Sequence, residues 1–136
     1  MVQREVADRL LAEPGTKNYS SISCFVAYFT KLEHVYTVKR TSFYPSPDVD
    51  SCILKMTMLQ KPPVEVADKD KLFMMIRGAF NQRRKSIINS LSREAVLNMP
   101  KDALSRILKM AGIDPTARPE TLSLADFAAI ANAVFQ

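Results

Sequence analysis

The chain has 136 residues, of which 47% are hydrophobic, and this composition excludes a disordered protein. Its three glycines argue against a glycine-rich loop that cradles a nucleotide phosphate. The net charge of +5 favours an acidic partner, and nucleic acid is the commonest partner of that kind.

The cysteines and the histidine exclude other classes of site. Cys24 and Cys52 lack the spacing of metal ligands, lie in apolar runs and are expected to be buried, inert thiols. One histidine leaves no histidine-based metal site and no catalytic triad. No apolar run is long enough to cross a membrane, so a cytoplasmic protein is expected.

Hydrophobic spacing predicts two helices in the first part of the chain. Residues 2–12 repeat apolar side chains at helical spacing, and Glu5 and Arg9 are placed for a surface ion pair. A second helix is expected from Ser20 or Ser21 to Phe29, and it should pack on more than one side. The apolar stripe of this second helix contains Ile22, Phe25, Val26 and Phe29.

Two strands and a proline-rich connector are predicted next. Residues 32–38 and 51–59 alternate in polarity, which predicts a wide hairpin. Pro45 and Pro47 predict a stiff, nearly extended connector that holds Phe43 and Tyr44 in set directions, although a rigid link with no other role is the alternative. Two strands do not form a stable sheet alone, so neighbours from a missing N-terminal half or from another chain are expected.

A change of pattern divides the chain. Two prolines and a change to helical spacing predict a first domain at residues 1–60, a linker at 61–67 and a helical domain at 68–136. A helical pattern runs from an N-cap at Asp68 to about residue 92, and a further helix covers 101–111. The inward residues of the helix at 101–111 are Leu104, Ile107, Leu108 and Met110.

The last helix is expected to begin with a capping box. Ser123 and Asp126 have the spacing of that motif. The inward residues of the helix are Leu124, Phe127, Ile130, Ala131 and Val134. The helical pieces after the linker suffice for a small bundle, so the predicted fold class is α+β: two helices and a hairpin, followed by a small all-α domain.

A basic cluster lies within the long helical pattern. Gln82, Arg83, Arg84 and Lys85, with Arg77 nearby, suit contacts with phosphate, and a solvated charged face is the alternative. An unbroken helix would place Arg83 in the apolar stripe, whereas a break at Asn81 and Gln82 would place Arg84 there. We favour the break, with Arg84 half-buried, because asparagine is a poor residue inside a helix.

Five segments, in order along the chain, resemble the ribosomal RNA adenine dimethyltransferases. Residues 43–51 match the signature Phe-x-Pro-x-Pro-x-Val-x-Ser of that family. The other matching segments are residues 1–10, 79–87, 112–115 and 118–123. Macrolide-resistance rRNA methyltransferases share the fold, but the Arg-Arg-Lys and Gly-Ile-Asp-Pro elements fit the dimethyltransferases better.

The resemblance implies transfer of methyl groups from S-adenosylmethionine to N6 of two adjacent adenines near the 3′ end of small-subunit rRNA. The glycine-rich cofactor loop, the acidic ribose-binding residue and the Asn-Leu-Pro-Tyr motif of the family would lie upstream of Met1. The chain is therefore expected to contain the end of a class I (Rossmann-like) methyltransferase domain and the small helical domain, to bind no S-adenosylmethionine and to be inactive alone.

The resemblance also implies roles for particular residues. Phe43 would lie beside the flipped target base, and the cluster of Arg77, Gln82, Arg83, Arg84 and Lys85 would contact rRNA. Self-association through residues 1–60 is expected if the sheet of the whole domain is missing. The alternative is a stand-alone basic module that binds RNA or a protein partner without catalysis.

Overall fold

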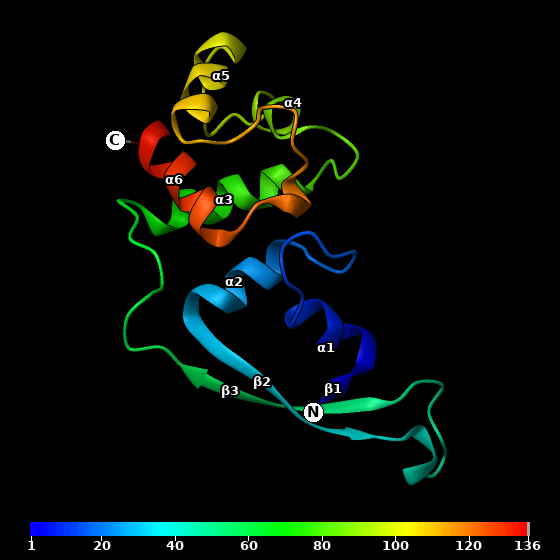
Figure 1. Cartoon of the computed structure of the whole chain (residues 1–136). Helices are drawn as coiled ribbons and strands as arrows, with labels where there is room; N and C mark the ends of the chain where they lie inside the picture. The colour runs from blue at the N-terminus through cyan, green and yellow to red at the C-terminus, as the bar shows by residue number, and fades with distance from the viewer. Residues whose placement is uncertain (136) are drawn as a thin grey trace.

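A small antiparallel sheet lies at one end of the molecule and a group of helices at the other (Figure 1). The computed structural model describes residues 1–135. The sheet has the order β1–β3–β2, with β1 at Val2–Gln3, β2 at Thr30–Val38 and β3 at Ser51–Met58. The predicted hairpin of β2 and β3 is confirmed. The helix predicted from residue 2 is wrong at its start, because Val2 and Gln3 are extended and pair with Cys52 and Ser51.

Helix α1 (Arg4–Leu10) and helix α2 (Ser21–Phe29) lie between the sheet and the other helices (Figure 1). The predicted extent of α2 is confirmed. Its predicted stripe is wrong in part, because Ile22 and Phe25 are exposed whereas Cys24 and Tyr28 are buried. The buried side of α2 is set by its contacts with α3 and α6 on one side and with α1 and β2 on the other.

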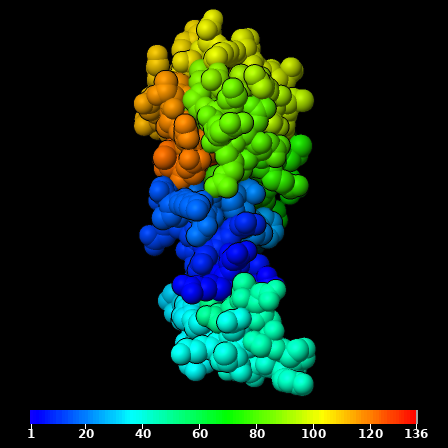
Figure 2. All heavy atoms as spheres, turned by 90° about the vertical axis from the view of Figure 1, so that its right-hand side faces the viewer, coloured from blue at the N-terminus to red at the C-terminus, as the bar shows by residue number. Residues whose placement is uncertain are grey.

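The hairpin projects beyond the N-terminal helices (Figure 2). Several large apolar side chains of β2 and β3 are exposed, including Val35, Tyr36 and Met56. The connector between the strands is a folded loop, so the prediction of a nearly extended segment is wrong. It begins with a 3₁₀ turn at Arg40–Ser42, contains a cis bond between Tyr44 and Pro45, and is closed by hydrogen bonds.

Two side chains close this connector loop. The Arg40 amide donates to Asp50 Oδ1 over 2.8 Å, and Ser46 Oγ donates to the Arg40 carbonyl over 2.9 Å. These bonds join the start of the loop to its middle and its end. Phe43 and Tyr44 therefore lie in a loop of defined shape.

The second part of the chain contains α3 (Lys69–Phe80), α4 (Ile87–Leu91), α5 (Lys101–Met110), a 3₁₀ turn η2 (Pro119–Thr121) and α6 (Leu124–Val134). Asp68 Oδ1 accepts hydrogen bonds from the amides of Asp70 and Lys71, which confirms the predicted N-cap. The capping box is also confirmed, because Ser123 and Asp126 exchange bonds of 2.9 and 3.1 Å. Within residues 1–135, no helix has the length and apolar character needed to cross a membrane.

One apolar core joins the helices. Leu72 and Ile76 of α3 pack with Phe127 and Ile130 of α6, and all four are essentially inaccessible to solvent. Tyr19, Cys24 and Tyr28, which precede the predicted linker, belong to the same core. The inward prediction for Met110 is wrong, because its side chain is 87% exposed at the end of α5. Leu104 and Leu108 of the same helix are buried as predicted.

The linker at residues 61–67 is bonded to the last helix. The Asn132 side chain donates to the Glu65 carbonyl over 2.8 Å and accepts from the Ala67 amide over 3.1 Å. Val64 and Val66 are partly buried against the core. The end of the segment is therefore attached to α6 at Glu65 and Ala67, and the division into two domains stays a prediction.

Candidate nucleic-acid interface

The basic cluster lies in the turn that connects α3 to α4. Helix α3 ends at Phe80, so the predicted break near Asn81 is confirmed. Arg83, Arg84 and Lys85 are all exposed. The prediction that Arg84 is half-buried is therefore wrong, because the residues between the helices form turns that carry both arginines away from the apolar core.

The cluster is divided between two neighbouring hollows. Arg84 and Lys85 line one hollow of about 320 Å³, together with residues 81–83. Arg77 and Arg83 line a second hollow of about 410 Å³, which we call the junction cleft because its other walls come from the first part of the chain. Arg83 lines both, and its Nη2 donates to the Lys17 carbonyl over 2.9 Å. Gln82 accepts a hydrogen bond from Arg93 Nη1 over 3.3 Å.

The junction cleft contains two cations that sequence reasoning did not assign to the site. Arg9, at the end of α1, and Lys17, in the loop before α2, line it opposite the arginines of the helical part. The predicted ion pair between Glu5 and Arg9 is absent, since the ion pairs within residues 1–135 are Lys31–Glu33 and Lys61–Glu65. The sequence offers one signal for Arg9, its position on the exposed face of a short helix.

The aromatic residues of the connector loop lie far from the basic cluster, at the opposite end of the molecule from α4 (Figure 1). Phe43 is partly buried, whereas Tyr44 is fully exposed. The structure therefore does not bring Phe43 together with Arg83 and Arg84. Any single ligand that contacts both must extend along the molecule.

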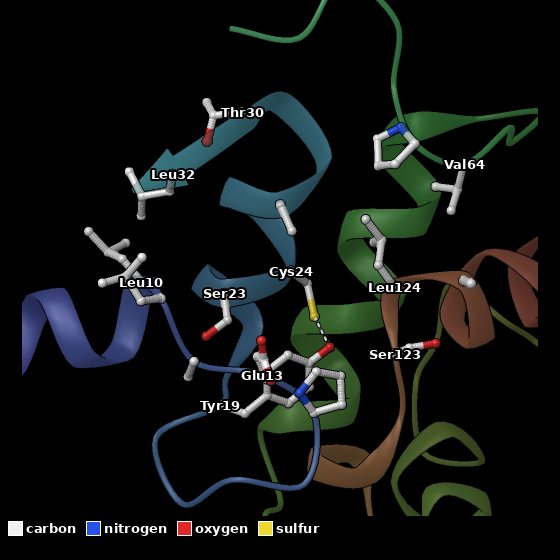
Figure 3. A pocket seen from close by; sticks show the side chains of 16 residues that line it. Leu10, Glu13, Tyr19, Ser23, Cys24, Thr30, Leu32, Val64, Ser123 and Leu124 are labelled. Atoms are coloured by element: carbon white, nitrogen blue, oxygen red, sulfur yellow. Dashed lines mark hydrogen bonds between the residues drawn. The ribbon is translucent and has the colours of Figure 1, made fainter. Parts of the chain in front are cut away.

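A separate cavity of about 500 Å³ is lined by residues of α1, α2, β2 and α6, and Glu13 is the one carboxylate in its lining. Figure 3 shows Leu10 and Leu32 on one side of it and Val64 and Leu124 on the other. The Tyr19 hydroxyl and Cys24 Sγ lie 3.0 Å apart in a hydrogen bond.

Two polar groups of this cavity, the Tyr19 hydroxyl and the Cys24 thiol, remain protonated near pH 7. Burial raises the pKa of the Cys24 thiol to about 11. Burial, with the hydrogen bond to Cys24, raises the pKa of Tyr19 well above its usual range. Neither group is therefore a nucleophile or a base near pH 7. Among the residues that the structure describes, no group of three metal-binding side chains is found.

Cys24 is expected to react with iodoacetamide far more slowly in the folded chain than in urea. A pKa near 11 instead of 9.0 lowers the reactive thiolate fraction about 100-fold, and the side chain is only 1% exposed. Mass spectrometry of the Cys52→Ser variant at pH 8 measures this rate, because Cys24 is then the one remaining thiol. Equal rates in buffer and in urea would contradict the buried, protonated state.

Comparison with known proteins identifies the family. The family described as ribosomal RNA adenine dimethylase matches residues 1–135, and the chain belongs to it. The ribosomal RNA small subunit methyltransferase A of Bacillus mycoides is 48% identical over 136 residues, which cover 98% of this chain and 46% of the relative. The same protein of Bacillus cereus shows the same values. The chain thus spans about half the length of these curated relatives.

Solved structures agree with this assignment. A dimethyladenosine transferase from Plasmodium falciparum superposes with a TM-score of 0.78 at 28% identity, covering 94% of this chain and 53% of that one. The 23S rRNA methyltransferase ErmE has a TM-score of 0.63 at 23% identity, covering 98% of this chain and 52% of its own. The second likeness shows a shared fold alone. The predicted family is therefore confirmed.

Proposed function

We propose that this chain is the RNA-contacting C-terminal half of an enzyme that dimethylates N6 of two adjacent adenines near the 3′ end of small-subunit rRNA. The observation that carries the proposal is the exposed basic surface of Arg77, Arg83, Arg84 and Lys85, which take part in no ion pair within residues 1–135. Such a surface suits a phosphate backbone. The name of the 48% identical relatives supports small-subunit rRNA as the target.

The proposed methyl donor of the whole enzyme is S-adenosylmethionine, and the residues present do not fit it. The cavity of about 500 Å³ has mostly apolar walls and one carboxylate, Glu13, among its lining residues. The sequence offers no glycine-rich turn that would let a backbone approach the donor. We therefore assign the donor site to the rest of the whole protein, and give this chain the task of binding and orienting RNA.

The connector loop provides a candidate contact for the target base. Phe43 is the residue that the resemblance places beside a flipped adenine, and an aromatic ring can stack on an extruded base. The loop is closed by the bonds of Asp50 and Ser46, which supports a role in positioning this ring. Because the basic surface lies at the other end of the molecule, RNA in this proposal runs along its length.

Exposed apolar residues on the hairpin support the same proposal. Val35, Tyr36 and Met58 are each more than half exposed. Large apolar side chains exposed together on one face often mark a surface that a partner covers. We propose that the remainder of the whole protein covers this face. In the isolated chain, the same face would favour self-association.

Calorimetry with two titrants tests the function. An RNA hairpin from the 3′ end of small-subunit rRNA, carrying the two adjacent adenines, is expected to bind the chain with an affinity that falls steeply as salt rises. S-adenosylmethionine is expected to give no binding heat, because the chain lacks the loop that would hold it. Absence of RNA binding at 50 mM salt would refute the RNA-contacting role. Micromolar binding of the methyl donor would refute its assignment to the rest of the protein.

A further inference from the structure

We propose that the junction cleft is a second phosphate-binding site, which holds a backbone phosphate of the same RNA strand that contacts Arg84 and Lys85. The inference rests on the proposed function and extends it, because it adds a contact from the first part of the chain. The cleft has a volume of about 410 Å³. Its lining residues are Arg9, Lys17, Asn18, Ser20, Ser21, Ile22, Arg77, Phe80, Asn81 and Arg83.

The charge of the cleft is unbalanced. Four cations line it, two from each part of the chain, and no aspartate or glutamate does. All four are exposed, and none forms an ion pair within residues 1–135. Cations gathered around one hollow repel one another unless an anion lies between them. An anion bound among the four cations would relieve this repulsion, and the lining of the cleft supplies none.

Polar groups in the same cleft suit an oxygen-rich anion. Ser20, the N-cap residue of α2, lines the cleft together with Asn18 and Ser21. Helix α2 begins at Ser21, so its N-terminus adds partial positive charge to the site. The bond from Arg83 to the Lys17 carbonyl fixes part of the guanidinium in advance, while its other N–H groups remain as donors.

The position of the cleft favours an RNA phosphate over a free one. Arg83 lines both the junction cleft and the hollow that contains Arg84 and Lys85. Neighbouring sites that share one arginine suit neighbouring phosphates of one strand. The face shown in Figure 2 includes the boundary at which the N-terminal segment, in blue, meets the helical part, in green. A strand bound there would contact both parts of the chain at once.

The test measures RNA affinity against salt for Lys17→Ala and Arg9→Ala. Each variant is expected to lower the slope of log affinity against log salt by about 0.7–0.9 and to weaken binding about sixfold at 0.1 M salt. Lys17→Arg should retain both values. Lys109→Ala is the matched control, because it removes an equally exposed lysine at the end of α5. Melting temperatures without RNA should not fall, since the removed cations repel their neighbours.

A second measurement uses inorganic phosphate as the probe. Phosphate at millimolar concentration should raise the melting temperature of the chain above that in chloride of equal ionic strength, and the Arg9→Ala/Lys17→Ala double variant should lose this shift. If phosphate stabilises the chain but the cleft variants bind RNA with unchanged slope, the site takes free phosphate and the RNA assignment is overturned.

The outcomes separate this inference from the proposed function. If Arg84→Ala/Lys85→Ala weakens RNA binding while the cleft variants behave like Lys109→Ala, the cleft site is refuted and the proposed function stands. If the unaltered chain binds no RNA, the proposed function is refuted, and the inference that rests on it is refuted with it. If Lys17→Ala lowers the melting temperature without RNA and its RNA affinity matches the control once corrected for folded fraction, the lysine is structural and the inference is wrong.

Discussion

Replacing Phe127 with alanine is expected to lower the free energy of unfolding by about 3–5 kcal/mol. The side chain is fully buried in α6, and its ring centroid lies 5.9 Å from that of Phe80. Its removal leaves a cavity that the surrounding helices cannot fill. Urea denaturation followed by circular dichroism measures the change.

Phe25→Ala is the control for this experiment. Phe25 is 46% exposed although its ring lies 5.1 Å from that of Phe73, so its loss should cost less than half as much. Equal losses at the two positions would show that the core is not centred on α6. A single transition is expected for the unaltered chain, because Tyr19 and Cys24 share the core of the helices. Two separate transitions would instead support independent domains on either side of residues 61–67.

Removing Arg84 and Lys85 together is expected to weaken RNA binding about 30-fold at 0.1 M salt. The salt slope should become shallower by about 1.4–1.8, the value for two lost phosphate contacts. The effect should be the same for every RNA sequence, because phosphate contacts carry no base information. The melting temperature should not change, since both side chains are exposed.

Fluorescence anisotropy over a range of salt concentrations measures both quantities. Arg106→Ala/Lys109→Ala, which removes one exposed arginine and one exposed lysine of α5, is the matched control. A loss confined to one RNA sequence would indicate base readout rather than backbone contact. If RNA affinity does not change, the basic cluster is only a solvated charged face, the alternative given in the sequence analysis.

Features set by local chemistry were predicted correctly. The N-cap at Asp68, the capping box of α6 and the end of α3 near Asn81 depend on residues within a few positions of one another. The hairpin strands have a period of two that is visible without knowledge of their partners. The family assignment rests on motifs such as residues 43–51, which are contiguous in sequence.

Features set by distant contacts were missed. Strand β1 has two residues, too few to show a period, and exists because Cys52 and Ser51 lie beside it. The junction cleft joins Lys17 to Arg83, which are 66 residues apart. No local sequence pattern indicates that Lys17 and Arg83 lie close together. The helix break near Asn81 follows from local propensity, but the position of Arg84 depends on the turns that follow the break, which leave its side chain exposed.

Helical spacing also identified apolar residues without showing which of them are covered. Met110 has the spacing of an inward residue but lies in the last turn of α5, where no neighbouring element reaches it. Ile22 and Phe25 of α2 line a hollow together with Phe73 and Ile76 of α3, and both side chains are covered only in part. Coverage depends on the arrangement of neighbouring helices, which one sequence period cannot specify.

The hydrogen bonds of Asn132 to the linker affect the entropy of binding. A flexible tether between the sheet and the helices would have to be ordered whenever one ligand contacts both parts, and that ordering would weaken binding. Here the Glu65 carbonyl and the Ala67 amide are already held by α6 in the folded chain. The conformational entropy of this segment is thus lost during folding, before any ligand arrives. A ligand that spans both parts meets a preorganised surface whose width is fixed in advance.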